Sequence, residues 1–166
     1  MILIFAVDNN WNIGVNGDML TAIPDDLTRF RLLTENNIIV MGRKTLEALP
    51  EQEPLANRIN ILVTRNEGYY RDGFHIIHSL DQLPELLSRL NPSDDMEVFV
   101  IGGGNIAIQL LSQCKRAYIT KILEVFPLAD TCIPNLDREE GWRLEKESEI
   151  FNFNGLKYKY VNYVRE

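Results

Sequence analysis

The sequence predicts an α/β protein with a central, mostly parallel sheet, flanking helices and an antiparallel hairpin strand near its C-terminal end. Short apolar runs rich in β-branched residues alternate with segments whose apolar residues recur at helical spacing. Near the end, the Asn154-Gly155 pair separates two segments with the character of strands, and this dipeptide is a strong signal for a hairpin turn.

Length and composition are those of an ordinary globular protein. The chain has 166 residues, a usual size for one domain, so we expect a single domain over residues 1–166. Hydrophobic residues make up 45% of the sequence and charged residues 25%, which argues against a disordered chain. The formal net charge of −7 argues against a general binder of nucleic acid or of an anionic membrane, because both usually carry a basic surface.

Cysteine usage and the start of the chain suggest a compartment. Cys114 and Cys132 are the two cysteines, and they lack CxxC or Cys/His spacing. We therefore expect no disulfide framework, no metal site and a reducing cytoplasmic environment. The chain starts with a strand-like segment at Ile2, without a basic region or a long apolar run, so neither a signal peptide nor a membrane span is expected.

The elements are expected in a regular order along the chain. Short apolar runs predict six strands, which are Ile2–Val7, Ile38–Met41, Ile59–Thr64, Phe74–Ile77, Val98–Ile101 and Arg116–Ile122. Helical spacing predicts four helices, which are Pro24–Thr34, Lys44–Leu49, Asp81–Leu90 and Asn105–Ser112. The final antiparallel pair is expected at Trp142–Ile150 and Leu156–Val164.

The first strand is followed by a long segment, Asp8–Leu20, that is polar and contains glycines but also carries apolar residues. This composition is typical of an active-site lid. An ordinary surface loop explains the segment equally well. The residues alone leave both interpretations open.

The first predicted helix places a carboxylate on its inward stripe. Asp26 and Phe30 are four residues apart, so they share one face of the helix. Asp25 and Asp26 can also simply complement the positive N-terminal end of the helix. If Asp26 instead borders a cleft, burial should raise its pKa into a range useful for proton delivery.

Cations follow two of the predicted strands. Arg43 and Lys44 come directly after the second strand, and Arg65 comes directly after the third. Together they favour an electropositive notch for a phosphate, although scattered surface cations remain an equal alternative for any one of them. Arg58 is a separate candidate for pairing with a carboxylate.

A glycine-rich turn joins the fifth predicted strand to the last predicted helix. Gly102, Gly103 and Gly104 stand between Val98–Ile101 and the helix that begins near Asn105. Glycine lets the backbone approach a ligand closely, and the start of a helix favours an anion, so a phosphate-bearing cofactor is the first interpretation. The alternative is that the glycines only let the helix pack closely against the sheet.

In order and spacing, this combination of motifs resembles the dihydrofolate reductase family over nearly the whole chain. The matching motifs are Ile13-Gly14, Pro24-Asp25-Asp26-Leu27 with Phe30, Met41-Gly42-Arg43-Lys44-Thr45, Arg58, Thr64-Arg65, Ile101-Gly102-Gly103-Gly104, Thr120 and Asp130-Thr131. The resemblance implies a three-layer sandwich, NADPH lying across the carboxyl ends of the strands, and a pterin in a cleft beside Asp26. It also implies a monomer that binds dihydrofolate and antifolate small molecules.

The resemblance assigns the substrate site residue by residue. Asp26 is the one ionisable group at the pterin and the catalytic residue, Thr120 supports it, and Arg58 holds the α-carboxylate of the substrate's glutamyl tail. The apolar part of the pocket is assigned to Ile4, Phe5, Leu27, Phe30, Leu49, Leu55 and Ile101.

The cofactor site is assigned in the same way. The nicotinamide site and its lid are assigned to Ala6, Ile13, Gly14 and Met19. The phosphates are assigned to Arg43, Thr45 and Arg65, with Gly42, Lys44, Thr64, Gly102, Gly103, Gly104, Asn105 and Ile106 completing the site. The family has a cis peptide bond between Gly102 and Gly103.

The chemistry that the resemblance implies is hydride transfer from the nicotinamide C4 to C6 of 7,8-dihydrofolate, with a proton added at N5. Asp26 does not touch N5, so we expect it to act indirectly, by polarising the pterin, with water as the final proton donor. The protein then contributes alignment, exclusion of water and control of that proton.

The sequence departs from the family at four positions. Leu20 and Thr21 replace the usual Pro-Trp pair, Leu46 replaces an aromatic residue, and Ala107 replaces a tyrosine. These changes predict a looser pocket, slower catalysis and altered affinity for diaminopyrimidine antifolates.

Three alternatives stay open at this point. Gly102-x-Gly104-x-x-Ala107, with Glu124 twenty residues beyond Gly104, also fits a Rossmann fingerprint, which would favour NADH, whereas Arg43 and Arg65 favour NADPH. A related pterin or pyrimidine reductase is the second alternative. A slow or non-catalytic pterin- or NADPH-binding homologue is the third.

Overall fold

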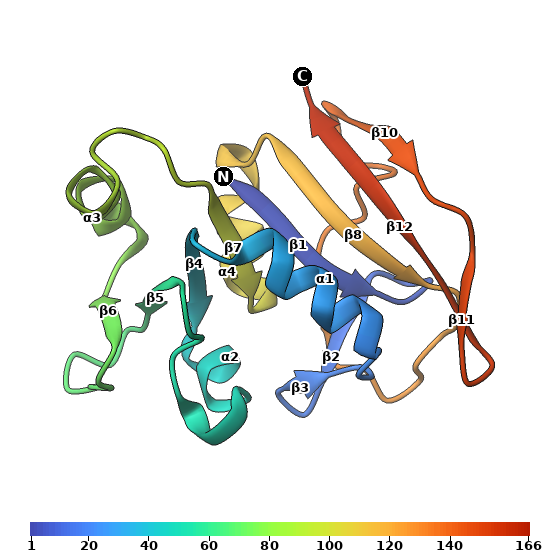
Figure 1. Cartoon of the computed structure of the whole chain (residues 1–166), viewed down its shortest axis with the longest axis horizontal. Coiled ribbons are helices and arrows are strands. Elements are labelled where there is room, and N and C mark those ends of the chain that lie inside the picture. Colours follow the sequence, from blue (N-terminus) through green and yellow to red (C-terminus); the bar gives the residue numbers. More distant parts are fainter.

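A computed structural model describes residues 1–166, and it is built around one nine-stranded sheet with helices on both faces (Figure 1). The strands occur in the order β10-β12-β8-β1-β7-β4-β5-β6, and β11 pairs with β12. The pairs from β8 through β1 to β6 are parallel, whereas β10, β11 and β8 each pair antiparallel with β12. The predicted fold class is confirmed.

The strands follow the apolar runs of the sequence closely. Their bounds are β1 Ile2–Val7, β4 Ile38–Gly42, β5 Ile59–Val63, β6 Phe74–Ile77, β7 Val98–Gly102, β8 Arg116–Ile122, β10 Trp142–Glu147, β11 Phe151–Phe153 and β12 Leu156–Arg165. Strands buried on both faces read as continuous apolar runs rather than as alternating ones, which is why β1, β4 and β7 could be located accurately.

The helices are short, and no helix has the length and apolar character needed to cross a bilayer. Their bounds are α1 Pro24–Thr34, α2 Arg43–Glu47, α3 Leu83–Leu90 and α4 Gly104–Leu110, with single 3₁₀ turns η1 Pro50–Gln52, η2 Leu80–Gln82 and η3 Leu111–Gln113. The bounds of α1 agree with the prediction. The predicted helix 81–90 divides into η2 and α3, and the predicted helix 105–112 ends in the tighter η3 turn.

The two faces of the sheet carry separate cores, so the molecule has three layers. On one face, Phe30 and Leu33 of α1 and Leu46 of α2 pack on a cluster that includes Ile4 and Phe99. The residues of the opposite core include Leu3, Phe5, Val40, Val100, Leu83 and Leu86 of α3, and Ala107 and Leu110 of α4. Figure 1 shows α1 crossing the front of the sheet and α4 lying behind it.

The C-terminal hairpin is present, but its first strand is not the one predicted. The Asn154-Gly155 turn joins β11 to the start of β12, and both turn residues have positive φ angles, 50° and 85°. The other half of β12 pairs with β10, from Trp142 opposite Arg165 to Glu147 opposite Val161. The predicted strand 142–150 is therefore interrupted after Glu147, where the chain crosses from one half of β12 to the other.

The segment after β1 is not the irregular loop that we expected. It contains β2 (Asn12–Val15) and β3 (Asp18–Met19), which form a small sheet with β9 (Thr131–Cys132) in the order β3-β2-β9. The turn between β2 and β3 is Asn16-Gly17, with φ angles of 51° and 81°. This dipeptide is the same hairpin signal as Asn154-Gly155, and the sequence reasoning passed over it.

Candidate active site

Asp26 lies at the junction of α1 with the central sheet. Pro24 occupies the first turn of α1, and the N-cap residue is Ile23, which has no side chain that can cap the helix. The hydroxyl of Thr120 on β8 donates a hydrogen bond of 2.5 Å to Asp26 Oδ1. Asp25 is exposed, whereas Asp26 is half-buried and directed at the sheet. Charge complementarity with the positive N-terminal end of α1 therefore does not account for the position of Asp26.

The protonation of Asp26 is set by opposing effects. Burial raises the pKa of the Asp26 carboxyl above its usual range, while the hydrogen bond from Thr120 and the positive charge of Arg29 act in the lowering direction. Thr120 is 3% exposed and lies opposite Ala6 of β1, so the bond is fixed by the packed sheet. No side chain donates to Asp26 Oδ2, so that oxygen is free to accept a hydrogen bond from a ligand.

Apolar side chains lie on the same face of the sheet as this carboxyl. Phe30, Leu49, Leu55 and Ile101 are partly buried and pack on the core cluster beneath α1 and α2. Leu27 is 43% exposed, as suits a residue at the mouth of a cleft. The residues Ile4, Ala6 and Ile101 lie on neighbouring strands β1 and β7 of this face.

Phe5 requires a correction. Successive side chains of a strand point to opposite faces, so Phe5 points away from the face that holds Ile4. Its ring is 8% exposed and packs in the core beneath α3 and α4. The side chain of Phe5 therefore does not line the cleft beside Asp26.

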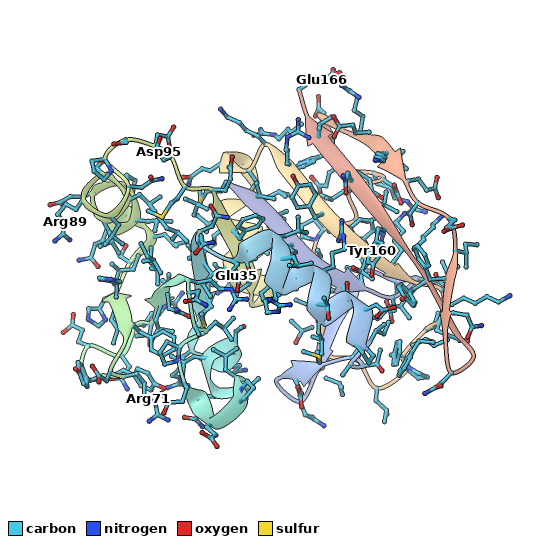
Figure 2. The ribbon with its side chains drawn as sticks, viewed as in Figure 1. Glu35, Arg71, Arg89, Asp95, Tyr160 and Glu166 are labelled. Atoms are coloured by element: carbon cyan, nitrogen blue, oxygen red, sulfur yellow. The ribbon has the colours of Figure 1, made fainter.

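Arg29 is a residue at this site that the sequence reasoning missed. Its guanidinium carbon lies 4.2 Å from the centroid of the Tyr160 ring and 5.9 Å from that of Tyr118. Figure 2 labels Tyr160 on β12, beside α1. The three-residue spacing from Asp26 to Arg29 was the available signal, because it places both side chains on one side of the helix.

Arg58 is held by neutral groups rather than by a carboxylate. Its Nε donates to Thr34 Oγ1 at 2.9 Å, its Nη1 donates to the carbonyl of Ala56 at 3.0 Å, and its guanidinium carbon lies 6.0 Å from the Phe30 ring centroid. The carboxylate partner predicted for Arg58 is not supplied by the protein. Burial lowers the pKa of Arg58, and the charge of Glu35 opposes this effect.

The cations that follow β4 and β5 lie at one edge of the sheet. The two strands are parallel neighbours, with Gly42 opposite Val63, so Arg43, Lys44 and Arg65 all emerge at their carboxyl ends. Arg43 pairs with Glu47 at 3.1 Å in an exposed position. Lys44 and Arg65 are exposed and form no ion pair, which leaves excess positive charge at this edge.

The three glycines at the junction of β7 and α4 have different surroundings. A Cβ on Gly102 would lie 2.3 Å from Thr45 Oγ1, and a Cβ on Gly104 would lie 2.6 Å from the carbonyl oxygen of Cys132. Close packing thus accounts for these two glycines. A Cβ on Gly103 would meet nothing nearer than 3.8 Å. The peptide bond between Gly102 and Gly103 is cis, as expected.

The β2–β3 hairpin is tied to the segment before β9. The backbone N–H of Asn16 donates to Asp130 Oδ2 at 2.9 Å, and the N–H of Asp130 donates to the carbonyl of Gly14 at 3.0 Å. Hydrogen bonds from Asn16 and Thr131 lower the pKa of Asp130. These bonds hold Ile13, Gly14 and Met19 in a regular hairpin beside the site.

Asp8 at the base of this hairpin was also missed. Its carboxylate accepts hydrogen bonds from the backbone N–H groups of Asn10, Asn12 and Phe126, at 2.9, 2.9 and 3.0 Å, and from the Asn12 side chain at 3.0 Å. Burial raises the pKa of Asp8, but these four bonds outweigh it and the net shift is downward. Asp8 therefore fixes the start of the hairpin to the loop after β8.

The residues that depart from the family pattern lie either in the cores or in the segment between β3 and α1. Leu46 and Ala107 are fully buried, in the cores on opposite faces of the sheet. Both positions are therefore used for packing. Thr21 is half-exposed in the segment between β3 and α1. Leu20 and Thr21 are thus the replacements that lie outside the cores.

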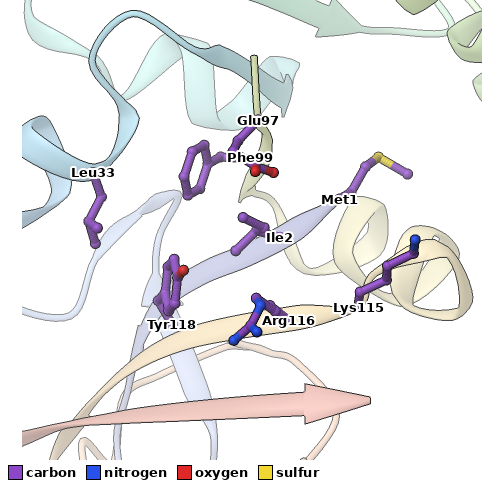
Figure 3. A pocket seen from close by; sticks show the side chains of 8 residues that line it. All are labelled: Met1, Ile2, Leu33, Glu97, Phe99, Lys115, Arg116 and Tyr118. Atoms are coloured by element: carbon purple, nitrogen blue, oxygen red, sulfur yellow. The ribbon is translucent and has the colours of Figure 1, made fainter. Parts of the chain in front are cut away.

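A hollow of about 470 Å³ lies at the other end of the same face, at the amino ends of β1, β7 and β8. Its lining residues, shown in Figure 3, are Met1, Ile2, Leu33, Glu97, Phe99, Lys115, Arg116 and Tyr118. Asp26 and Thr120 do not line it. The hollow therefore lies apart from the Asp26 carboxyl.

Comparisons with known proteins agree with this geometry. The sequence model of the family described as "Dihydrofolate reductase" matches residues 1–165. Dihydrofolate reductase from Bacillus subtilis is 34% identical, covering 96% of this chain and 94% of that protein. The enzyme from Mycobacterium tuberculosis is 32% identical, covering 98% of this chain and 96% of that protein.

A solved structure shows the same likeness in three dimensions. Dihydrofolate reductase from Enterococcus faecalis, complexed with NADP(H) and the compound RAB-propyl, superposes with a TM-score of 0.82. It is 30% identical, and the match covers 99% of this chain and 95% of the other. Sequence and fold thus agree over the whole length, and the chain belongs to the dihydrofolate reductase family.

Proposed function

We propose that this chain catalyses the NADPH-dependent reduction of 7,8-dihydrofolate to 5,6,7,8-tetrahydrofolate. The observation that carries the proposal is the Asp26–Thr120 pair, in a chain that belongs to the family. One oxygen of Asp26 accepts from Thr120, and the other accepts no hydrogen bond from the protein, on a face of the sheet that carries apolar side chains. A carboxylate so placed suits an amino-pyrimidine edge, which offers neighbouring N–H donors.

The same cleft suits the rest of the substrate. Leu27, Phe30 and Ile101 present apolar surface to a flat ring, with Leu49 and Leu55 on the same side. Arg58 is already oriented by Thr34 and Ala56, and the protein supplies it no carboxylate. We assign to Arg58 the α-carboxylate of the glutamyl tail, because a guanidinium binds a carboxylate through two parallel hydrogen bonds.

The edge of the sheet fits NADPH. Lys44 and Arg65 carry unpaired positive charge, and Arg43 is paired only in an exposed position, as suits the binding of phosphates. Thr45 and Thr64 add hydroxyls there. The other residues assigned to the cofactor are Ala6, Ile13, Gly14, Met19, Gly42, Gly102, Gly103, Gly104, Asn105 and Ile106. When bound, NADPH supplies the hydride that reduces C6 of the pterin.

The residues of the chain align the pterin and control the proton that is added at N5. The hydrogen bond from Thr120 fixes the orientation of Asp26, which in turn orients the pterin and favours a proton at N5. The hairpin that carries Met19 and the apolar side chains of α1 limit access of water. Water that reaches N5 is the proposed final proton donor.

The test is the initial rate of NADPH oxidation by the purified chain with 7,8-dihydrofolate. An NADH control and the variant Asp26→Asn accompany it. NADPH-selective turnover that falls sharply in Asp26→Asn supports the proposal. Equal rates in the native chain and the variant, or a preference for NADH, contradict it.

A second candidate is a sibling reductase, or a slow homologue, that acts on another pterin. Thr21 favours it, because this position lacks the bulk and the indole N–H of the family's usual tryptophan. Tight NADPH binding without turnover of dihydrofolate, measured by fluorescence titration beside the rate assay, would select this candidate. Restoration of fast turnover in Thr21→Trp would assign the difference to the cleft.

The proposed setting is a monomer in the cytoplasm that binds antifolate small molecules, with no nucleic-acid or membrane partner. The free thiols Cys114 and Cys132 and the net charge of −7 are compatible with this setting. Light scattering of the purified chain tests the monomer directly. Displacement of dihydrofolate by a diaminopyrimidine tests the antifolate site.

A further inference from the structure

Arg29 is a half-buried cation without a carboxylate partner. It forms none of the six ion pairs of the chain, whereas its neighbour Arg31 on the same helix pairs with Glu35 at 3.7 Å. Its guanidinium instead stacks on the Tyr160 ring, with 4.2 Å between the guanidinium carbon and the ring centroid. A stacked guanidinium retains its full charge, and this charge acts on whatever anion lies nearby.

The anion that lies nearby is Asp26. Tyr160 lies directly opposite Thr120 in the pairing of β12 with β8, and Thr120 holds Asp26 by its hydroxyl. One cross-strand pair therefore positions both the carboxylate and the cation. Arg29 and Asp26 are also one turn apart on α1, which keeps their separation fixed by the helix itself.

The positive charge of Arg29 acts on Asp26 although the two side chains form no ion pair. Arg29 makes no ion pair with Asp26, so it occupies neither carboxylate oxygen, and Oδ2 stays free for a ligand. A direct ion pair would neutralise the carboxylate and compete with the pterin for it. A cation that is nearby but not in contact favours the ionised form of the carboxylate and does not compete with the pterin for its oxygens.

Resting on the function proposed above, we propose that Arg29 is a positioning residue for Asp26. Held on the Tyr160 ring, it supplies the positive charge that favours the ionised carboxylate and leaves an oxygen of that carboxylate open to the substrate.

Side chains from three elements lie around Asp26 and Arg29 and determine how the Asp26 carboxyl titrates. Thr120 and Tyr118 come from β8, Tyr160 and Tyr158 come from β12, and Arg29 comes from α1 itself. Burial raises the pKa of Tyr160 to about 12, so this ring stays neutral through the range in which Asp26 titrates. Arg29 is thus the one neighbour whose charge acts on Asp26 in that range.

The experiment is a titration of the Asp26 carboxyl by ¹³C NMR, beside the pH dependence of kcat for NADPH oxidation. Arg29→Met removes the charge and keeps an unbranched side chain, Arg29→Lys keeps the charge, and Arg31→Met is the matched control. Arg29→Met should move the carboxyl midpoint upward by about one pH unit, because the nearby positive charge is lost. Arg29→Lys should restore at least half of that shift, and Arg31→Met should leave the midpoint unchanged.

A carboxyl midpoint in Arg29→Met that equals the native one would overturn the proposal, as would an equal shift in Arg31→Met. If Arg29→Met does not fold, Arg29→Gln replaces it in the experiment. The pH profile of kcat should move with the carboxyl midpoint, which a purely structural role would not produce. The titration needs no turnover, so a chain that fails to reduce dihydrofolate but shows the shift refutes the proposed reaction and not the link between Arg29 and Asp26.

Discussion

The Asp26 side chain lowers the free energy of unfolding when it is charged. Burial raises its pKa, so the folded protein holds the proton more tightly than the unfolded chain does. Ionisation above the ordinary pKa of 3.8 therefore lowers the free energy of unfolding, and protonation at acid pH restores it. A cost of this kind is typical of a functional residue rather than of a structural one.

We expect Asp26→Asn to separate activity from stability. The rate of dihydrofolate reduction at pH 7 should fall by about 100-fold or more, with partial recovery in acid, because the carboxylate that orients the pterin is lost. The free energy of unfolding at pH 7 should rise by on the order of 1 kcal/mol, since folding no longer places an ionised carboxylate at this half-buried position. Steady-state kinetics and urea unfolding measure the two effects, and a variant with both reduced activity and reduced stability would contradict this account.

Gly104 is required by packing. A Cβ there would lie 2.6 Å from a backbone carbonyl oxygen of Cys132, which cannot move away as a flexible side chain would. Gly104→Ala should lower the free energy of unfolding by about 2 kcal/mol, because the small sheet must shift. Gly68→Ala is the control, since its Cβ would meet nothing nearer than 3.6 Å. Equal unfolding midpoints for the two variants would count against this assignment.

At the scale of elements, one exposed carboxylate adds to the backbone pairing that holds the β2–β3 hairpin against β9 and the segment before it. Asp130 joins Asn16 and Gly14 through two hydrogen bonds, and it is exposed, so the link contributes little to global stability. Its loss should act on the position of the hairpin and not on the fold. The hairpin carries Met19, which we place at the nicotinamide site.

We expect Asp130→Ala to reduce kcat by about 10-fold while leaving the unfolding midpoint unchanged, because the turn of the hairpin loses the side-chain hydrogen bond to Asn16. Asp95→Ala, an exposed carboxylate far along the chain, is the control and should change neither quantity. Pre-steady-state kinetics of NADPH oxidation would detect the effect. A loss of stability comparable to that of a core mutation would show that the link is structural.

At the scale of the whole molecule, the acid stability depends on Asp8. Its folded pKa is lowered from 3.8, so its contribution is present above the unfolded pKa and is lost as the pH falls through the folded pKa. Asp8→Asn should lower the free energy of unfolding by about 2 kcal/mol at pH 7, since an amide NH2 in place of Oδ2 faces the N–H donors of the Asn12 side chain and of the Phe126 backbone. The difference from the native chain should shrink as the pH falls below the ordinary pKa of 3.8 and through the lowered folded pKa. Urea unfolding across this range measures it, and a constant difference would contradict the linkage.

The sequence located most of the architecture because buried parallel strands and amphipathic helices leave clear patterns. The bounds of β1, β6, β8 and α1 were predicted to the residue. The small sheet of β2, β3 and β9 was missed, because its strands have two to four residues and no usable periodicity. The break after Glu147 was missed because it depends on which half of β12 each partner occupies.

The candidate site divides in the same way. The family resemblance identified Asp26 and Thr120, and the structure places them in contact. The stacking of Arg29 on Tyr160 depends on the register of β8 against β12, which no local pattern specifies. The family resemblance assigned Phe5 to the apolar pocket, whereas strand alternation in β1 turns its side chain into the opposite core.

The place of β12 in the chain has a consequence for synthesis. All the residues that we assign to substrate and cofactor lie between Ile4 and Thr120, yet β12, at Leu156–Arg165, is the strand that covers β8. A ribosome that has translated the proposed site has not yet made Tyr160 or the core residue Val161. Until it does, β8 presents an open edge on which another chain can pair. The nascent protein therefore carries its binding residues before it has the strand that protects them from aggregation.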